Sequence, residues 1–190
     1  MYGNAGYRLE TYREYIEKVF LQEPELYAFR PTAPNYPRIA TFVYSDVPEE
    51  GYTTGVTYGL SEYDNAAWVS GRPELLVSVH SADESWGRAA GFAAARFQTD
   101  SDFSYGSILD FEQPISPDSE MQAFFLFAPS ILEPMDYLDI KLDYYSVNIV
   151  GMYPIYKEEI STIQRIGLEQ FMKHHDYNMF AVNRKVILSS

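Results

Sequence analysis

The chain has 190 residues, of which 46% are hydrophobic and 16% aromatic, and it contains no cysteine. This length and composition are typical of a single globular domain, and the lack of cysteine excludes disulfides, thiol nucleophiles and thiolate metal sites. With 27 acidic against 14 basic side chains the formal net charge is −13, which argues against nucleic acid as a partner because phosphates would be repelled.

The sequence shows no signature of export or membrane insertion. Its first 17 residues alternate tyrosine, glycine and charged residues and lack the apolar core of a secretory signal. Apolar runs of about 18 residues, long enough to cross a bilayer, do not occur. Together with the absence of cysteine, which fits a reducing compartment, these features predict a cytoplasmic protein that does not bind membranes.

The N-terminal part predicts a helix, a connector and two strands. Residues 7–20 repeat apolar side chains at helical spacing. Prolines within residues 24–37 then predict a loop-like connector. Strands are expected over 38–45 and 52–60, and in the second strand threonine and glycine alternate along one face, which would let another element approach closely.

The middle of the chain predicts a strand over residues 74–80 followed by a helix. Ser81 and Glu84 have the spacing of a capping box, which would open a helix that continues to Phe97. This helix is rich in alanine and glycine, so we expect it to pack on the small-residue face of the 52–60 strand. Trp86, near its start, is expected in the core; the alternative is an exposed binding residue.

The C-terminal part predicts three strands and a helix. Residues 123–128 are continuously apolar, as in a strand buried on both faces, whereas 138–144 alternate between apolar and charged side chains. A strand over 147–152 and a helix over 157–174 follow. Strands in series with interposed helices indicate an α+β fold, with a mixed β-sheet flanked by helices in a single domain spanning residues 1–190.

The residues needed for common catalytic and metal sites are missing from the sequence. Histidine occurs only at positions 80, 174 and 175, and neighbouring side chains on a predicted helix point about 100° apart, so His174 and His175 should not chelate one ion together. No nucleophile elbow and no phosphate-binding glycine loop is present. We expect no cofactor, no metal site and no catalytic residues. A pair of carboxylates acting as a hydrolase stays open, because their separation cannot be read from sequence.

Acidic residues are concentrated in one stretch. Nine carboxylates and no base lie between Arg96 and Lys141. Such a stretch is usually a solvated face without a specific role. The alternative is a docking surface for a basic partner. The candidate partner-binding residues lie in its first half, expected to be loop and sheet edge: Asp100, Asp102, Asp110, Glu112, Asp118 and Glu120.

Several short segments occur in an order and spacing that are informative together. They are Tyr-Gly-Leu-Ser-Glu-Tyr at 58–63, the strand at 74–77, the helix with Trp86, Phe-Leu-Phe-Ala-Pro at 125–129, Tyr-Pro-Ile-Tyr-Lys-Glu-Glu at 153–159, and a last helix with Ile166-Gly167-Leu168 and Phe171. In this order and spacing, from about Thr41 to Leu188, the sequence resembles the suppressor-of-fused domain family in its bacterial single-domain form. The first helix and proline-rich connector, residues 1–37, are not placed by the resemblance.

The resemblance implies a mixed sheet flanked by helices, without catalysis or cofactor. Bacterial members of the family are regarded as immunity proteins, which bind and neutralise toxins. The animal relative holds a transcription-factor peptide as an added strand between two domains. Since this sequence ends soon after the first of these domains, we do not expect its signalling role here, while strand capture at a sheet edge is left open.

The leading hypothesis is therefore an immunity protein that neutralises a bacterial toxin by direct binding. Its partner would be another protein, a basic toxin domain, since toxins that attack nucleic acid tend to be basic. The first alternative is a generic protein-interaction or scaffold domain. The second is a carboxylate-based hydrolase.

Overall fold

Residues 5–32 and 34–188, which the computed structural model describes, contain an eight-stranded mixed sheet in the order β1-β2-β3-β4-β8-β6-β5, with β7 paired to β8. The strands are β1 (Glu25–Phe29), β2 (Ile39–Ser45), β3 (Tyr52–Tyr58), β4 (Arg72–His80), β5 (Ile108–Asp110), β6 (Ala123–Phe127), β7 (Ile140–Leu142) and β8 (Tyr145–Ile155). The pair β4–β8 is parallel and the other pairs are antiparallel.

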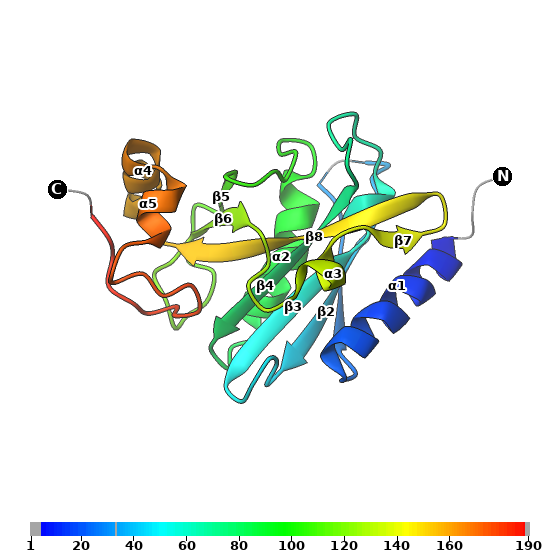
Figure 1. Ribbon diagram of the computed structural model, residues 1–190, viewed down its shortest axis with the longest axis horizontal. Helices are drawn as coiled ribbons and strands as arrows, with labels where there is room; N and C mark the ends of the chain where they lie inside the picture. Colours follow the sequence, from blue (N-terminus) through cyan, green and yellow to red (C-terminus); the bar gives the residue numbers. More distant parts are fainter. Residues whose placement is uncertain (1–4, 33, 189–190) are drawn as a thin grey trace.

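Helices cover both faces of this sheet. They are α1 (Ala5–Phe20), α2 (Ser85–Phe97), α3 (Pro134–Tyr137), α4 (Lys157–Ile166) and α5 (Leu168–Met172), with a 3₁₀ turn, η1 (Leu60–Glu62). In Figure 1, α1 and α3 lie in front of the sheet, α2 lies behind it, and α4 and α5 pack at one end. The prediction of one α+β domain, with a mixed sheet flanked by helices, is confirmed. Among the described residues, no helix has the length and apolarity needed to cross a membrane.

The close approach of α2 to β3 is the main packing feature. A Cβ atom on Gly55 would lie 2.1 Å from the carbonyl oxygen of Gly87, and one on Gly91 would lie 2.0 Å from Thr41 Oγ1. Real Cβ atoms are not found this close to another heavy atom, so glycine is required where helix and sheet meet. The expected packing of the alanine-rich helix on the small-residue face of β3 is confirmed.

Trp86 lies in the largest buried cluster of the described chain, between α2 and the sheet. It is 0% exposed, and its ring centroid lies 6.3 Å from that of Phe124 in an edge-to-face arrangement. Its indole N–H donates to the Asp118 carboxylate at 3.0 Å. The expected core position is confirmed.

The proline-rich connector contains a strand that the sequence analysis missed. β1 runs between Pro24 and Pro31 and pairs antiparallel with β2, with Leu26 opposite Phe42. Its side chains are mostly exposed, so the alternation that marks a half-buried strand is absent. The prolines mark the ends of this edge strand, where no ladder bond is lost.

The expected capping box is wrong. α2 begins at Ser85, and Glu84 makes no side-chain cap bond. The Asp83 carboxylate accepts the Ser85 N–H at 2.8 Å instead, and the Ser81 hydroxyl accepts the Asp83 N–H at 3.1 Å. Ser81 also donates to Asp118 at 2.6 Å, so its hydroxyl contacts a loop that is distant in sequence. Spacing alone does not reveal such a contact.

The expected single strand over 138–144 is a hairpin. β7 is only three residues long, and the chain turns at Asp143, whose φ is +48°. β8 then begins at Tyr145 and extends beyond both ends of the expected strand 147–152. The buried residues of β7 alternate with an exposed lysine, as predicted. The predicted alternation of buried and exposed residues was therefore correct, but the predicted length of the strand was wrong.

The expected helix over 157–174 is interrupted at Gly167. This residue has φ +84° and ψ 151°, a conformation that favours glycine, and it separates α4 from α5. α5 ends at Met172, so His174 and His175 lie beyond it. The argument that a helix holds these two side chains apart is therefore wrong.

Candidate functional site

The six candidate carboxylates are distributed along α2 rather than gathered at one point. Asp100 and Asp102 follow its C-terminus, and Asp118 lies at its N-terminus against Trp86. A helix of this length spans about 20 Å. Asp110, on the edge strand β5, and Glu112 are brought together, because the Glu112 N–H donates to Asp110 Oδ1 at 2.8 Å. Glu120 lies in the loop before β6 and is exposed.

Asp118 lies at the surface, but its carboxylate is held by hydrogen bonds to the protein's own side chains. Its Oδ1 accepts from Trp86, and the Ser116 hydroxyl lies 2.6 Å from both Asp118 and Asp83. Partial burial opposes ionisation of Asp118, but hydrogen bonds from Ser116, Ser81 and Trp86 hold its pKa below the ordinary value. Its carboxylate therefore anchors a loop to the start of α2.

Asp102 and Glu112 present charge to solvent. The Ser104 hydroxyl donates to Asp102 at 2.8 Å, and this bond lowers the pKa of the Asp102 carboxyl, which stays ionised. Glu112 is 77% exposed and lies 3.3 Å from Arg96 on α2. Such an exposed pair is weak and can exchange for a partner's cation.

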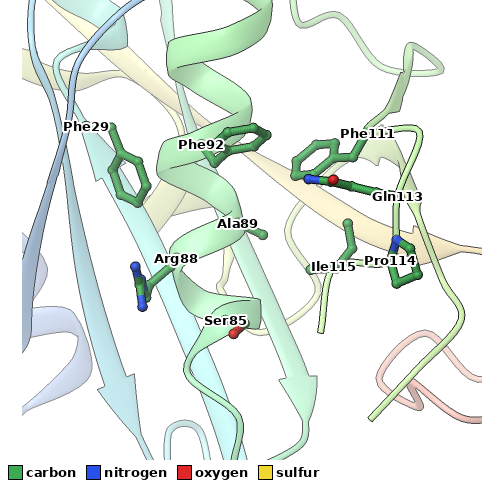
Figure 2. Close-up of a pocket in the computed structure, with 9 residues that line it drawn as sticks. All are labelled: Phe29, Ser85, Arg88, Ala89, Phe92, Phe111, Gln113, Pro114 and Ile115. Atoms are coloured by element: carbon green, nitrogen blue, oxygen red, sulfur yellow. The ribbon is translucent and has the colours of Figure 1, made fainter. Parts of the chain in front are cut away.

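The outer face of α2 forms a shallow groove of about 230 Å³. Figure 2 shows Phe92 turned toward Phe111 and Gln113, whereas Phe29 and Arg88 lie on the other side of the helix. Phe92 remains 37% exposed although its ring centroid lies 5.2 Å from that of Phe111. An exposed aromatic ring with apolar walls is typical of the centre of a protein interface.

Arg88 gives this groove a positive charge. Its guanidinium stacks over the Tyr27 ring at 4.9 Å, and within the described part of the chain it forms no salt bridge. Arginine and aromatic residues dominate binding energy in interfaces. Phe92 and Arg88, four residues apart, could have been found in the sequence, because each directly follows a glycine that faces the sheet.

His174, His175 and Asp176 place potential metal ligands within 4.8 Å of one another in the turn after α5. The histidine rings stack with centroids 4.5 Å apart. The Asp176 N–H donates to His174 Nδ1 at 3.2 Å, which occupies one of the two ring nitrogens of His174. These three residues are consecutive in sequence and largely exposed, and we assign them no metal-binding role.

Glu74 is a fully buried carboxylate that the sequence analysis did not identify. It accepts hydrogen bonds from Thr57 Oγ1 at 2.6 Å, Gly59 N–H at 2.8 Å, and Ser61 N–H and Oγ at 3.0 and 2.6 Å. The Gly-Leu-Ser turn therefore serves to bind this carboxylate. Because Glu74 is 0% exposed, a substrate does not reach it.

Glu74 should make stability depend on pH. Burial raises the pKa of Glu74 despite the four hydrogen-bond donors. Between the pKa of the unfolded chain and this raised value, Glu74 is therefore protonated in the folded protein and ionised in the unfolded chain. This contribution to stability is present below the ordinary carboxyl pKa and is lost as pH rises through the raised folded value. In Glu74→Gln, unfolding free energy measured by urea titration should lose that part of its pH dependence. An unchanged pH profile would contradict this assignment.

Three comparisons with known proteins were made. The sequence model of the family described as Suppressor of fused protein (SUFU) matches residues 35–185. A search of curated proteins finds no match. A crystal structure of a SUFU homologue from Neisseria gonorrhoeae FA 1090 superposes with a TM-score of 0.67 at 14% identity, covering 95% of this chain and 97% of that one. The Sufu–Fu complex crystal structure gives a TM-score of 0.62 at 12% identity, covering 94% and 91%. At these identities the two structures share the fold.

Proposed function

Since the chain belongs to the suppressor of fused protein family, we propose that it is a protein-binding domain, without catalytic activity, that docks its partner on the outer face of α2. The observation that carries this proposal is the groove along α2, which Phe92 and Arg88 line from its two sides and which Glu112 adjoins in sequence, between the lining residues Phe111 and Gln113. A similar solved structure is that of the Sufu–Fu complex, which supports a protein partner.

We further propose that the partner is a basic protein, and specifically a toxin domain that this chain neutralises as an immunity protein. The net charge of −13 and the exposed carboxylates flanking α2 would steer a cationic protein toward the groove. Neutralisation by binding requires only that the partner's active surface be covered. The similarity to a Neisseria protein supports a bacterial setting.

A scaffold domain for another protein is the alternative, and it would use the same groove. A partner captured by pull-down from the native lysate and then co-expressed with this chain separates the two, because only an immunity protein relieves toxicity. A hydrolase has less support, since the best-defined buried carboxylate, Glu74, is closed to solvent.

The charge proposal predicts salt-dependent association. Replacing Asp100, Asp102, Asp110 and Glu112 by their amides should slow binding of the captured partner by about 10-fold at low salt and flatten the dependence of rate on ionic strength. Folding stability should change by less than about 0.5 kcal/mol. Association rates from stopped-flow mixing or surface plasmon resonance test this.

A matched control removes the same charge elsewhere. Glu10, Glu14, Glu49 and Glu50 are exposed, on α1 and on the turn between β2 and β3. Changing these four to glutamine removes the same number of negative charges, so a larger effect in the first variant assigns the steering to the α2 side. Equal rates and salt slopes in wild type and both variants would show that the acidic stretch is only a solvated face.

A further inference from the structure

We propose a second docking site, an apolar hollow beside β8 with Asp102 in its lining, which receives a large apolar side chain of the partner next to a lysine or arginine. The hollow has a volume of about 280 Å³ and lies between residues 67–71, residues 102–105 and Leu138, with Asn148 and Val150 as its floor. This inference rests on the proposed function and specifies the partner's chemistry.

Exposed apolar side chains gather at this hollow. Val69 is 89% exposed, Tyr105 48% and Leu138 43%, and all three line it. Tyr105 extends the apolar surface to Phe127, which is 38% exposed, with ring centroids 5.3 Å apart. Isolated exposed apolar residues are common, but a contiguous group of them around a concavity is typical of an interaction site.

The floor of the hollow is held in place by hydrogen bonds. Asn148 Nδ2 donates to the Ser70 carbonyl at 3.0 Å, and its Oδ1 accepts the Asp139 N–H at 2.8 Å. The Trp68 indole N–H donates to the Asp102 carbonyl at 2.9 Å. These bonds join loops that are distant in sequence, so the site is formed before binding, which lowers the entropic cost of association.

Charge at the hollow favours a cation. None of the described residues that line it is a lysine or arginine, while the exposed Asp102 carboxylate is part of the lining. The nearby cations are already paired: Arg72 lies 3.1 Å from Asp64, and Lys141 pairs with Asp139. An apolar side chain flanked by basic residues would fill the hollow and meet Asp102. This distinguishes it from the groove on α2, which contains Arg88.

Tryptophan fluorescence gives a direct test. The protein has two tryptophans, of which Trp68 lines the hollow and Trp86 is fully buried. Acetyl-Lys-Leu-Lys-amide should change the emission of the whole protein saturably at millimolar concentration, and acetyl-Glu-Leu-Glu-amide and acetyl-Lys-Ala-Lys-amide should bind at least about 5-fold more weakly. The signal should vanish in Trp68→Phe. Equal responses to the three peptides would overturn the proposal.

Surface variants supply the second arm. Asp102→Asn should weaken binding of the Lys-Leu-Lys peptide by up to about 5-fold. Val69→Lys, which places a cation in the hollow, should weaken this binding by at least as much. Leu26→Lys makes the same change at a 62%-exposed side chain on β1 and should have no effect. Unchanged melting temperatures confirm that the fold is intact. Unaltered peptide affinity in Val69→Lys would refute the site.

Binding of the captured basic partner separates this inference from the proposed function. If both are correct, Val69→Lys and Phe92→Ala each raise the dissociation constant by about 10-fold or more. If Phe92→Ala weakens binding while Val69→Lys matches wild type, the hollow is not a docking site and the proposed function stands. If the wild type binds no basic partner, the proposed function fails, whatever the peptides do.

Discussion

Trp86→Ala is expected to lower the free energy of unfolding by about 3–5 kcal/mol, because it leaves a cavity between α2 and the sheet. The side chain is 0% exposed and packs edge-to-face on Phe124. Its loss also removes a hydrogen bond from Asp118, whose carboxylate then keeps only its serine partners. Guanidinium unfolding followed by far-ultraviolet circular dichroism measures the change without relying on tryptophan emission.

Two controls define the cause. Trp86→Phe keeps most of the apolar volume and should cost less than the alanine variant. Trp68→Ala changes a half-buried tryptophan and should also cost less. If Trp86→Ala unfolds at the wild-type midpoint but loses partner binding, Trp86 is a binding residue and its assignment to the core is wrong.

Glu159→Ala should be destabilising by a similar amount, about 3–5 kcal/mol, because it leaves a buried cation without its counterion. Glu159 and Arg184 are 0% and 4% exposed, and the two guanidinium nitrogens lie 2.5 and 2.8 Å from the carboxylate oxygens. Glu159 also accepts the N–H groups of Tyr156 and Ile187, at 2.9 and 2.8 Å. It therefore ties the start of α4 to the C-terminal segment. Urea denaturation gives the magnitude.

The coupling between the two charges can be isolated. Arg184 stacks on the rings of Tyr156, Phe171 and Tyr177, so methionine at this position retains apolar packing. The double variant Glu159→Leu/Arg184→Met removes both charges and should recover part of the stability lost in Glu159→Ala. A double variant less stable than the single one would show that the ion pair does not account for the loss.

Sequence patterns predicted the fold correctly where the residue types of a segment directly reflect how that segment packs. The glycine and threonine face of β3 and the small residues of α2 indicated their contact, since only small side chains allow such an approach. β1 could not be found in this way, because its side chains lack a buried face. The break at Gly167 depends on a backbone angle that an apolar periodicity does not report.

The candidate site was predictable only in part. Counting charge identified the exposed carboxylates Asp102 and Glu112, but it could not show that the Asp118 carboxylate accepts hydrogen bonds from Ser81, Trp86 and Ser116. Phe92 was missed although the glycine before it marks the sheet-facing side of α2, and the hollow at Val69 was missed because its lining comes from segments that are distant in sequence. The association experiment tests four of the six carboxylates: Asp100, Asp102, Asp110 and Glu112.

The parallel pairing of β4 with β8 has a consequence for folding kinetics. β1 to β4 form a meander of neighbouring strands, whereas Arg72 and Val147, which pair in the parallel ladder, are separated by α2, α3 and three strands. The entropy cost of closing so long a loop arises before the contacts between β4 and β8 can stabilise the fold. Folds with such long-range contacts form in about milliseconds to seconds. On a ribosome, β4 would wait with an open edge until β8 emerges. The hollow, whose floor belongs to β8, would therefore be completed after the meander has formed.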